Sequence, residues 1–126
     1  MTVGAEDLLA EADAAAANAY APYSGYQVGA AVLAHDGRVF AAANVENAAY
    51  PLGICAERSA IAKAASEGLR PGGLESIALT ASPCGGCRQW LHEWRFDQVH
   101  FRRADGTIAT YTPDELLPET WDLPER

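Results

Sequence analysis

The pattern of apolar and polar positions changes along the first half of the chain, from helical spacing to two β-rich runs. The segment 5–20 carries apolar residues at helical spacing and many good helix formers, which predicts a first helix before the loop "APYSG". Two β-rich runs, "YQVGAAVLA" and "RVFAAANV", flank "HDG", whose Asp36-Gly37 pair is a strong hairpin signal. The pattern therefore predicts one helix followed by two antiparallel strands.

Helical and strand patterns alternate in the second half. The segment from Cys55 to Leu69 is helical, with Gly68 placed to end it, and "ESIALTA" is typical of a short buried strand. "CGGCRQWLHEW", behind Pro83, predicts a second helix of this half, and "QVHFRR" and "TIATYT" predict a closing hairpin before the short segment "PDELL". This order of elements predicts an α/β fold, a sheet of about five strands covered by helices.

Length and charge narrow the possible functions. A chain of 126 residues fits a single domain, 1–126, and 49% hydrophobic with 21% charged residues is ordinary for a globular protein. The net charge of -8 and the scattered basic residues argue against a nucleic-acid partner. The N-terminus lacks a basic leader and no apolar run approaches bilayer length, so we expect a cytoplasmic protein without a membrane partner.

Three cysteines are the main chemical clue, and without an export signal we expect them to be reduced thiols. The predicted fold places Cys55, Cys84 and Cys87 near the N-terminal ends of two helices separated by one strand, where successive elements tend to be neighbours. A helix N-terminus favours a thiolate through its unpaired amides and its dipole. Three thiolates suit zinc and leave a fourth position for water, which is typical of catalytic zinc.

Two charged residues directly follow the first of these cysteines in "CAER". Glu57 lies two residues beyond Cys55 and can face the open metal position as a proton carrier. Arg58 lies three residues beyond Cys55, on about the same helical face, and can donate hydrogen bonds to the thiolate sulfurs. Such bonds would offset the negative charge of three thiolates on one zinc ion.

Other interpretations of the cysteines remain open. A C-x-x-C pair at a helix start can be a redox pair, but that leaves the third cysteine and its Glu-Arg neighbours unexplained. Cysteines buried as small hydrophobic residues would gather at two helix starts only by coincidence. A structural zinc site would need a fourth ligand from His35, His92 or His100, each of which is also typical of an ordinary surface or strand histidine.

"CAE" followed by "PCGGC" matches the zinc-deaminase pattern in its all-cysteine variant. With "YAPYSGYQVGAA", "NVENAAYPLGICAER", "SPCGGCRQ" and "ELLP", the chain resembles the small homotetrameric cytidine deaminases from about Tyr20 to Trp121. The resemblance implies a three-layer α/β/α fold with a mixed five-stranded sheet. It also implies hydrolytic deamination of cytidine and 2′-deoxycytidine in pyrimidine salvage, with active sites at the contacts between subunits.

The resemblance further assigns roles to the residues of the two cysteine motifs. Cys55, Cys84 and Cys87 correspond to the zinc ligands, and Glu57 corresponds to the residue that carries protons. Arg58 corresponds to the arginine that bonds to ligand sulfurs in the all-cysteine members. The expected cofactor is therefore Zn²⁺.

The resemblance also implies that several further residues contact a nucleoside. They are Tyr26, Asn44, Glu46, Tyr50, Ala56 and Trp121. Asn44 and Glu46 resemble the pair that holds the ribose hydroxyls, and their spacing of two along a strand end directs both side chains to one face. Tyr50 and Trp121 are expected to approach the substrate of a neighbouring subunit.

The chain departs from the family pattern at three places. Tyr26 and Trp121 stand where relatives usually carry phenylalanine, but both remain aromatic and can still stack on a pyrimidine. "IALTASPCGGC" is several residues shorter than is common, so we expect a different pocket rim there. Two alternatives remain: a deaminase of another aminopyrimidine nucleoside such as blasticidin S, against which "NVEN" argues, and a non-catalytic zinc module, against which Glu57 argues.

Overall fold

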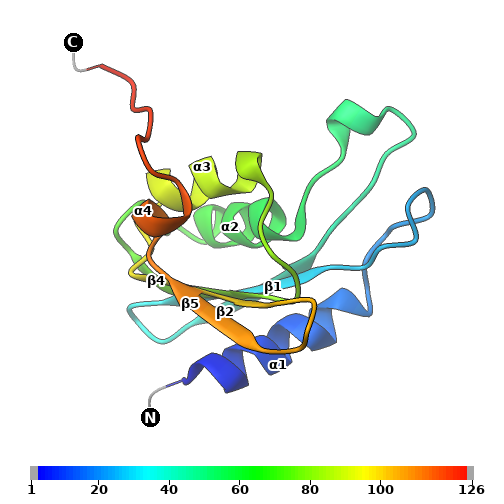
Figure 1. Cartoon of the computed structure of the whole chain (residues 1–126), viewed down its shortest axis with the longest axis horizontal. Coiled ribbons are helices and arrows are strands. Elements are labelled where there is room, and N and C mark those ends of the chain that lie inside the picture. The colour runs from blue at the N-terminus through cyan, green and yellow to red at the C-terminus, as the bar shows by residue number, and fades with distance from the viewer. Residues whose placement is uncertain (1–2, 125–126) are drawn as a thin grey trace.

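The computed structural model describes residues 3–124 and contains a mixed five-stranded sheet between helices on both faces (Figure 1). The strands lie in the order β2-β1-β3-β4-β5. Their bounds are β1 Gly29–Ala34, β2 Val39–Ala43, β3 Leu74–Leu79, β4 Gln98–Arg102 and β5 Ile108–Tyr111. The helices are α1 Ala5–Ala16, α2 Ala56–Ser66, α3 Gly85–Glu93 and α4 Pro113–Leu116, with a 3₁₀ turn at Tyr50–Leu52. Because α1 covers one face and α2 and α3 cover the other, the predicted three-layer fold is confirmed.

The connections between the strands follow the predicted order. β1 pairs antiparallel with β2 and with β3, β3 pairs parallel with β4, and β4 pairs antiparallel with β5. The two hairpin turns contain Gly37 and Gly106, at φ 94° and 89°, a backbone region that glycine enters without steric cost. Both predicted hairpins are therefore confirmed. The helix after Cys55 ends near Gly68 as the pattern indicated.

The first helix is shorter than its pattern predicted. It ends at Ala16, although helix-forming residues continue to Tyr20. The cause is a distant contact: the N–H of Tyr20 donates to the carbonyl of Asn44, and the Tyr20 carbonyl accepts from the N–H of Glu46. These bonds place residue 20 beside the segment that follows β2, so the chain must leave the helix before it.

The hydrophobic core has one part on each face of the sheet. Alternate residues of β1 face opposite sides: Val32 packs under α2 and α3, while Leu33 packs under α1. This explains why the β1 sequence is an unbroken apolar run. A side chain at Gly29 would collide with the Ala12 carbonyl of α1, so this glycine allows the close approach of helix and sheet. Within residues 3–124, every helix is too short or too polar to cross a bilayer.

His100 of β4 is a buried histidine, and its pKa makes a testable prediction. Its side chain is 6% exposed and its Nδ1 lies 2.8 Å from Thr110 Oγ1. Burial lowers the pKa of this imidazole because desolvation penalises the charged form. The unfolded chain, with a histidine pKa of about 6.5, then binds the proton more readily than the folded one. The stability that neutral His100 contributes is therefore lost as the pH falls below about 6.5 towards the folded pKa.

We expect the free energy of unfolding of the wild type to decline more steeply between about pH 7.5 and pH 5 than that of His100→Asn. Urea unfolding followed by circular dichroism over this range measures the difference, and comparing the two proteins cancels contributions from other groups. Parallel declines in the two proteins would show that burial of His100 has no effect on acid stability.

Candidate active site

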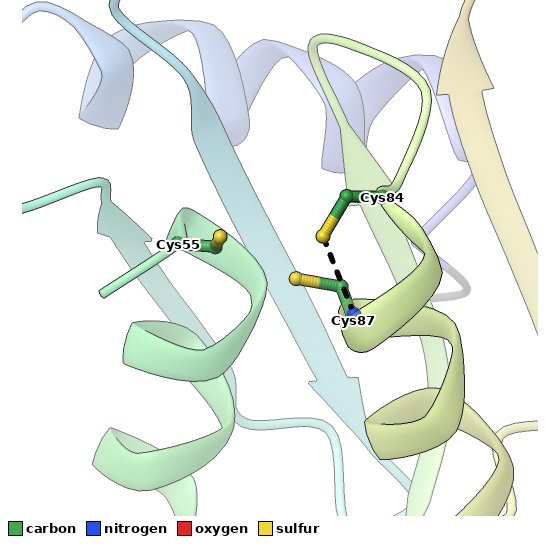
Figure 2. A group of neighbouring side chains, drawn as sticks. All are labelled: Cys55, Cys84 and Cys87. Atoms are coloured by element: carbon green, nitrogen blue, oxygen red, sulfur yellow. Dashed lines mark hydrogen bonds between the residues drawn. The ribbon is translucent and has the colours of Figure 1, made fainter. Parts of the chain in front are cut away.

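The two cysteine motifs meet where α2 and α3 begin. Cys55 is the N-cap residue of α2, Cys84 is the N-cap residue of α3, and Cys87 lies in the first turn of α3. The two helices lie over the same face of the sheet, so their N-terminal ends come together (Figure 2). The three Sγ atoms all lie within 4.8 Å of one another. The structure thus brings together three thiols that are up to 32 residues apart in sequence.

The three thiols differ in their electrostatic surroundings. Burial raises the pKa of Cys87, and the nearby Glu57 carboxylate raises it further. Burial also raises the pKa of Cys55. Burial opposes the ionisation of Cys84, but its pKa is lowered overall because the N–H and the thiol of Cys87 and the N–H of Gly86 donate to its sulfur. Cys87 N lies 3.4 Å from Cys84 Sγ.

Glu57 and Arg58 lie beside the sulfurs. Glu57 is 5% exposed, which is unusual for a carboxylate without a paired cation. The Arg58 guanidinium is near Cys87: burial opposes its charged form, but its interactions with the cysteine sulfurs, Cys87 above all, raise its pKa overall. Its Nε is buried and has no hydrogen-bond partner among residues 3–124. Its Nη2 lies against Gly86, where any side chain would displace it.

The donor set fits a bound divalent cation. The three sulfurs lie within 4.8 Å of one another, the buried Glu57 carboxylate lies beside Cys87, and Arg58 is the nearby cation. Without a positive ion, burial and mutual repulsion hold the thiols of Cys55 and Cys87 protonated, whereas a metal ion stabilises their thiolates. Thiolate ligands favour zinc over magnesium or calcium. Among the described residues, the metal-binding group contains the three cysteines and none of the histidines considered above.

A cavity of about 250 Å³ opens beside the sulfurs. Its wall includes Cys55, Cys84 and five other residues expected at the site; these are Tyr26, Asn44, Glu46, Ala56 and Glu57. Glu57 and two of the three clustered cysteines therefore border the same space. A larger groove, of about 400 Å³, lies between α2 and α3 and contains none of these residues. We take the smaller cavity as the reaction site because it alone among the cavities described borders the chemical groups.

Two expected substrate contacts do not line this cavity within one chain. Tyr50 is 73% exposed and its ring meets that of Tyr23 edge-on, with centroids 5.9 Å apart. Trp121 is 64% exposed and lies on the segment after α4. Neither aromatic side chain is therefore part of the cavity wall in the single chain.

Asn44 holds the segment before β1 with both ends of its side-chain amide. Its Oδ1 accepts a hydrogen bond from Val28 N at 2.8 Å, and its Nδ2 donates to the Tyr26 carbonyl at 2.9 Å. These two hydrogen bonds were not predicted from the sequence, whose spacing indicated only that Asn44 and Glu46 share one face. The asparagine therefore shapes the cavity wall as well as lining it.

Glu46 fastens the turn in front of this segment. Its Oε1 accepts from Tyr23 N at 3.0 Å and from Ser24 N at 3.1 Å, and its other oxygen accepts from the Ser24 hydroxyl. These bonds, from the hydroxyl first and then from the backbone, lower the pKa of the carboxyl. Ser24 itself lines the cavity and was missed by sequence reasoning. The "YSG" turn indicated that a serine hydroxyl lies in this loop, but nothing in the sequence indicated that it would bond to Glu46, 22 residues away.

Comparisons with known proteins agree with this geometry. Residues 3–103 match the family model described as the cytidine and deoxycytidylate deaminase zinc-binding region. The chain is 45% identical over 119 residues to a cytidine deaminase of Halalkalibacterium halodurans, covering 88% of this chain and 89% of the relative. It is 41% identical over 121 residues to a cytidine deaminase of Sporosarcina psychrophila, covering 90% of this chain and 88% of the relative.

Solved structures give the same result. The crystal structure of cytidine deaminase from Burkholderia pseudomallei superposes with a TM-score of 0.87 at 39% identity, covering 96% of this chain and 100% of the other. The crystal structure of cytidine deaminase from Mycobacterium leprae superposes with a TM-score of 0.78 at 37% identity, covering 94% of this chain and 100% of the other. The matching zinc-binding region and the cluster of three cysteines assign zinc as the cofactor. The chain belongs to the cytidine and deoxycytidylate deaminase family.

Proposed function

We propose that this protein deaminates cytidine and 2′-deoxycytidine to uridine and 2′-deoxyuridine, releasing ammonia. The observation that carries the proposal is the cluster of three thiols within 4.8 Å of one another beside a cavity that the buried Glu57 also lines. A zinc site that only braced two helices would have no need of a buried carboxylate at its side. The similar proteins named cytidine deaminase support the choice of substrate.

Glu57 is the proton carrier of the proposed reaction, and Cys55, Cys84 and Cys87 hold the zinc ion. Zinc, when bound, supplies a Lewis acid that lowers the pKa of a water molecule from about 15.7 toward 7. Glu57 accepts a proton from this water and gives it to ring N3 as the water oxygen adds to C4 of the base. It then takes the proton of the new hydroxyl group on C4 and passes it to the amino group, so that the C4 carbonyl forms, the C–N bond breaks and ammonia leaves. Its burial keeps bulk water from competing for these protons.

Asn44, Glu46, Tyr26 and Ala56 are the proposed nucleoside contacts within the chain. An amide and a carboxylate on one side of the cavity offer both donors and acceptors to the ribose hydroxyls. The oxygens of Glu46 already accept hydrogen bonds from the turn at Ser24, but each carboxylate oxygen can accept more than one. Tyr26 is exposed at the cavity and can pack against the nucleoside.

The proposed assembly is a homotetramer whose active sites lie between subunits. Its support is a set of exposed large apolar side chains; these are Tyr20, Tyr23, Tyr50, Leu52, Ile54, Trp90 and Trp121. The apolar groove between α2 and α3, which contains Trp90, is a further surface that a second copy can cover. In this assembly Tyr50 and Trp121 reach the nucleoside of a neighbouring copy. The free thiols support a cytoplasmic location, and the reaction products support a role in pyrimidine salvage.

The decisive experiment combines a metal measurement with an ultraviolet assay of nucleoside loss on the full-length protein purified without chelators. We expect one zinc ion per chain and turnover of cytidine and deoxycytidine in preference to blasticidin S. Zinc-loaded protein that leaves both nucleosides intact would refute the proposed function. Preference for the antibiotic would instead favour the related aminopyrimidine deaminase.

Gly86 offers a way to test Arg58 without altering it. A side chain at Gly86 would meet the Arg58 Nη2, the end of a flexible side chain that can move aside. We therefore expect Gly86→Ala to fold but to displace the guanidinium from Cys87, and Arg58→Gln to remove it. Changes to groups that support metal ligands typically cost about 10- to 100-fold, and we expect each variant to lose kcat for cytidine within this range.

The neighbouring glycine supplies the matched control. A side chain at Gly85 would meet no atom within 4 Å, so Gly85→Ala should keep wild-type kcat. The double variant Gly86→Ala/Arg58→Gln should be no worse than Arg58→Gln alone, because both changes remove the same contact. Wild-type kcat in Arg58→Gln, or additive losses in the double variant, would show that Arg58 does not act on the sulfurs as proposed.

A further inference from the structure

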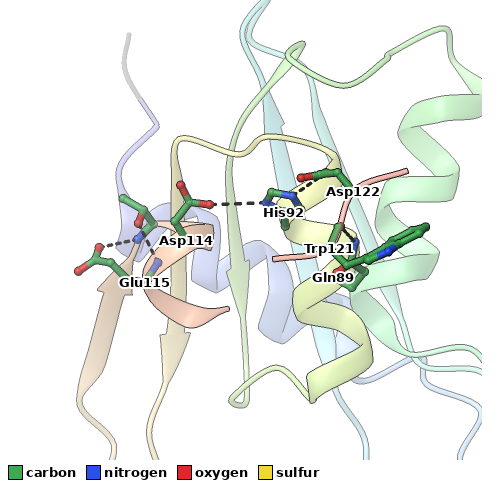
Figure 3. Close-up of polar contacts among 7 residues, drawn as sticks. Gln89, His92, Asp114, Glu115, Trp121 and Asp122 are labelled. Atoms are coloured by element: carbon green, nitrogen blue, oxygen red, sulfur yellow. Dashed lines mark hydrogen bonds and ion pairs between the residues drawn. The ribbon is translucent and has the colours of Figure 1, made fainter. Parts of the chain in front are cut away.

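The segment after α4 is fastened to α3 by two side chains one helical turn apart (Figure 3). Gln89 Nε2 donates to the backbone carbonyl of Trp121 at 3.0 Å. His92 Nε2 lies 2.9 Å from Oδ1 of Asp122. Gln89 and His92 are three residues apart and so lie on the same face of the helix. Two consecutive residues of the segment are therefore held by polar contacts to α3.

The imidazole of His92 also links this segment to α4. Its Nδ1 lies 3.5 Å from Oδ1 of Asp114, so each ring nitrogen faces a carboxylate. The His92 side chain is 17% exposed, whereas those of Asp114 and Asp122 are 84% and 70% exposed. The histidine is thus the well-packed member of the cluster and the two aspartates are its exposed partners. One side chain holds both α4 and the segment beyond it.

The residue fixed by these contacts is an exposed aromatic. The carbonyl of Trp121 and the side chain of the next residue are bound, but the indole is 64% exposed and points away from His92 (Figure 3). A segment without regular secondary structure would otherwise sample many backbone conformations, and ordering it has an entropic cost. The contacts to α3 offset this entropic cost when the chain folds, so the cost does not recur when the indole contacts another molecule.

We propose that Gln89 and His92 are positioning residues for deamination, holding Trp121 where it contacts the nucleoside bound to a second copy of the chain. This inference rests on the proposed function and assembly. Neither residue lines the cavity beside the sulfurs, so both act through Trp121. Helix α3 also carries Cys84 and Cys87. One helix therefore supplies two metal-binding thiols to its own site and supports the aromatic that serves another site.

A double-mutant cycle on the zinc-loaded, full-length enzyme tests the proposal. We expect His92→Ala to raise the KM for cytidine by about 2- to 10-fold, the range for loss of one hydrogen bond, with kcat little changed. Trp121→Ala should raise KM further. Because His92 acts through Trp121, the KM of the double variant should equal that of Trp121→Ala alone. His92→Gln, which keeps a donor, should restore part of the loss.

The control is the other histidine-aspartate pair on the surface. His35 Nε2 lies 3.5 Å from Asp97 Oδ2, and His35→Ala should leave KM unchanged. A second readout does not depend on activity: with 5-fluorotryptophan, the ¹⁹F resonance missing from Trp121→Phe reports on Trp121. We expect it to shift and narrow in His92→Ala and to stay unchanged in His35→Ala.

The outcomes separate this inference from the proposed function. Absence of cytidine turnover by the zinc-loaded wild type would overturn the proposed function and the positioning role with it. An active wild type with additive KM effects in the double variant would overturn the positioning role alone. So would an unchanged KM in His92→Ala or in Trp121→Ala, or an unmoved Trp121 resonance in His92→Ala.

Discussion

Glu57→Ala is expected to lose nearly all deaminase activity while keeping its fold and its zinc. A positioned general acid-base group typically contributes about 10²- to 10⁴-fold, and we expect a loss of kcat of at least this size because Glu57 acts twice in one turnover. The carboxylate is buried beside the sulfurs but is not part of the three-thiol group. Steady-state assays with cytidine, zinc analysis and circular dichroism measure the three properties separately.

A second glutamate near the end of the same helix provides the control. Glu67 is exposed at the C-terminal end of α2, and Glu67→Ala should retain wild-type kcat. Glu57→Gln should resemble Glu57→Ala, because the amide fills the same space but cannot accept and return a proton. If either Glu57 variant kept most of its turnover, the proton carrier would have to be another group.

Cys87→Ala is expected to lose both zinc and stability. The thiol is fully buried and lies among the other two sulfurs, so its removal takes away one of three ligands. A ligand present at 1,000 times its Kd stabilises the folded state by about 4.1 kcal/mol, and the variant should lose a contribution of this order. The measurements are zinc content per chain and thermal unfolding with and without added zinc.

Wild-type protein stripped of zinc by a chelator is the matched comparison for this variant. Its unfolding temperature should fall towards that of Cys87→Ala and recover when zinc is restored, whereas the variant should not respond. We expect the same behaviour from Cys84→Ala. A Cys87→Ala protein that still holds one zinc ion per chain at the wild-type unfolding temperature would exclude this thiol as a ligand.

Local patterns predicted most of the fold. The hairpin signal at Asp36-Gly37 and the β-rich runs beside it predicted β1 and β2, because turn conformation and strand preference depend largely on neighbouring residues. The predicted end of the first helix was wrong because the backbone of Tyr20 forms hydrogen bonds with residues that follow β2. The residues of the alanine-rich segment do not by themselves predict that contact. Propensity describes a segment by itself, and tertiary contacts decided where this helix stopped.

The candidate site, like the fold, was predicted from the sequence only in its local parts. The spacing of Cys84 and Cys87 and the position of Glu57 after Cys55 predicted a metal site because each motif lies within one helical turn. Contacts between distant segments had no such signal. The bonds of Asn44 and Glu46 to the segment before β1 and those of His92 to the last residues span between 16 and 30 positions. Only the folded chain reveals these partners.

The turn held by Glu46 has a consequence for the proposed contact between this carboxylate and the ribose. Its carboxylate is fixed by Ser24 and by two backbone amides, so its direction is set before a sugar arrives. A rigid acceptor tolerates little displacement of the hydroxyl it meets, whereas a free side chain would follow that hydroxyl. Because those same bonds lower its pKa, the carboxylate stays ionised well below neutrality. Selection between sugar shapes at this edge should therefore be stringent and insensitive to mild acidification.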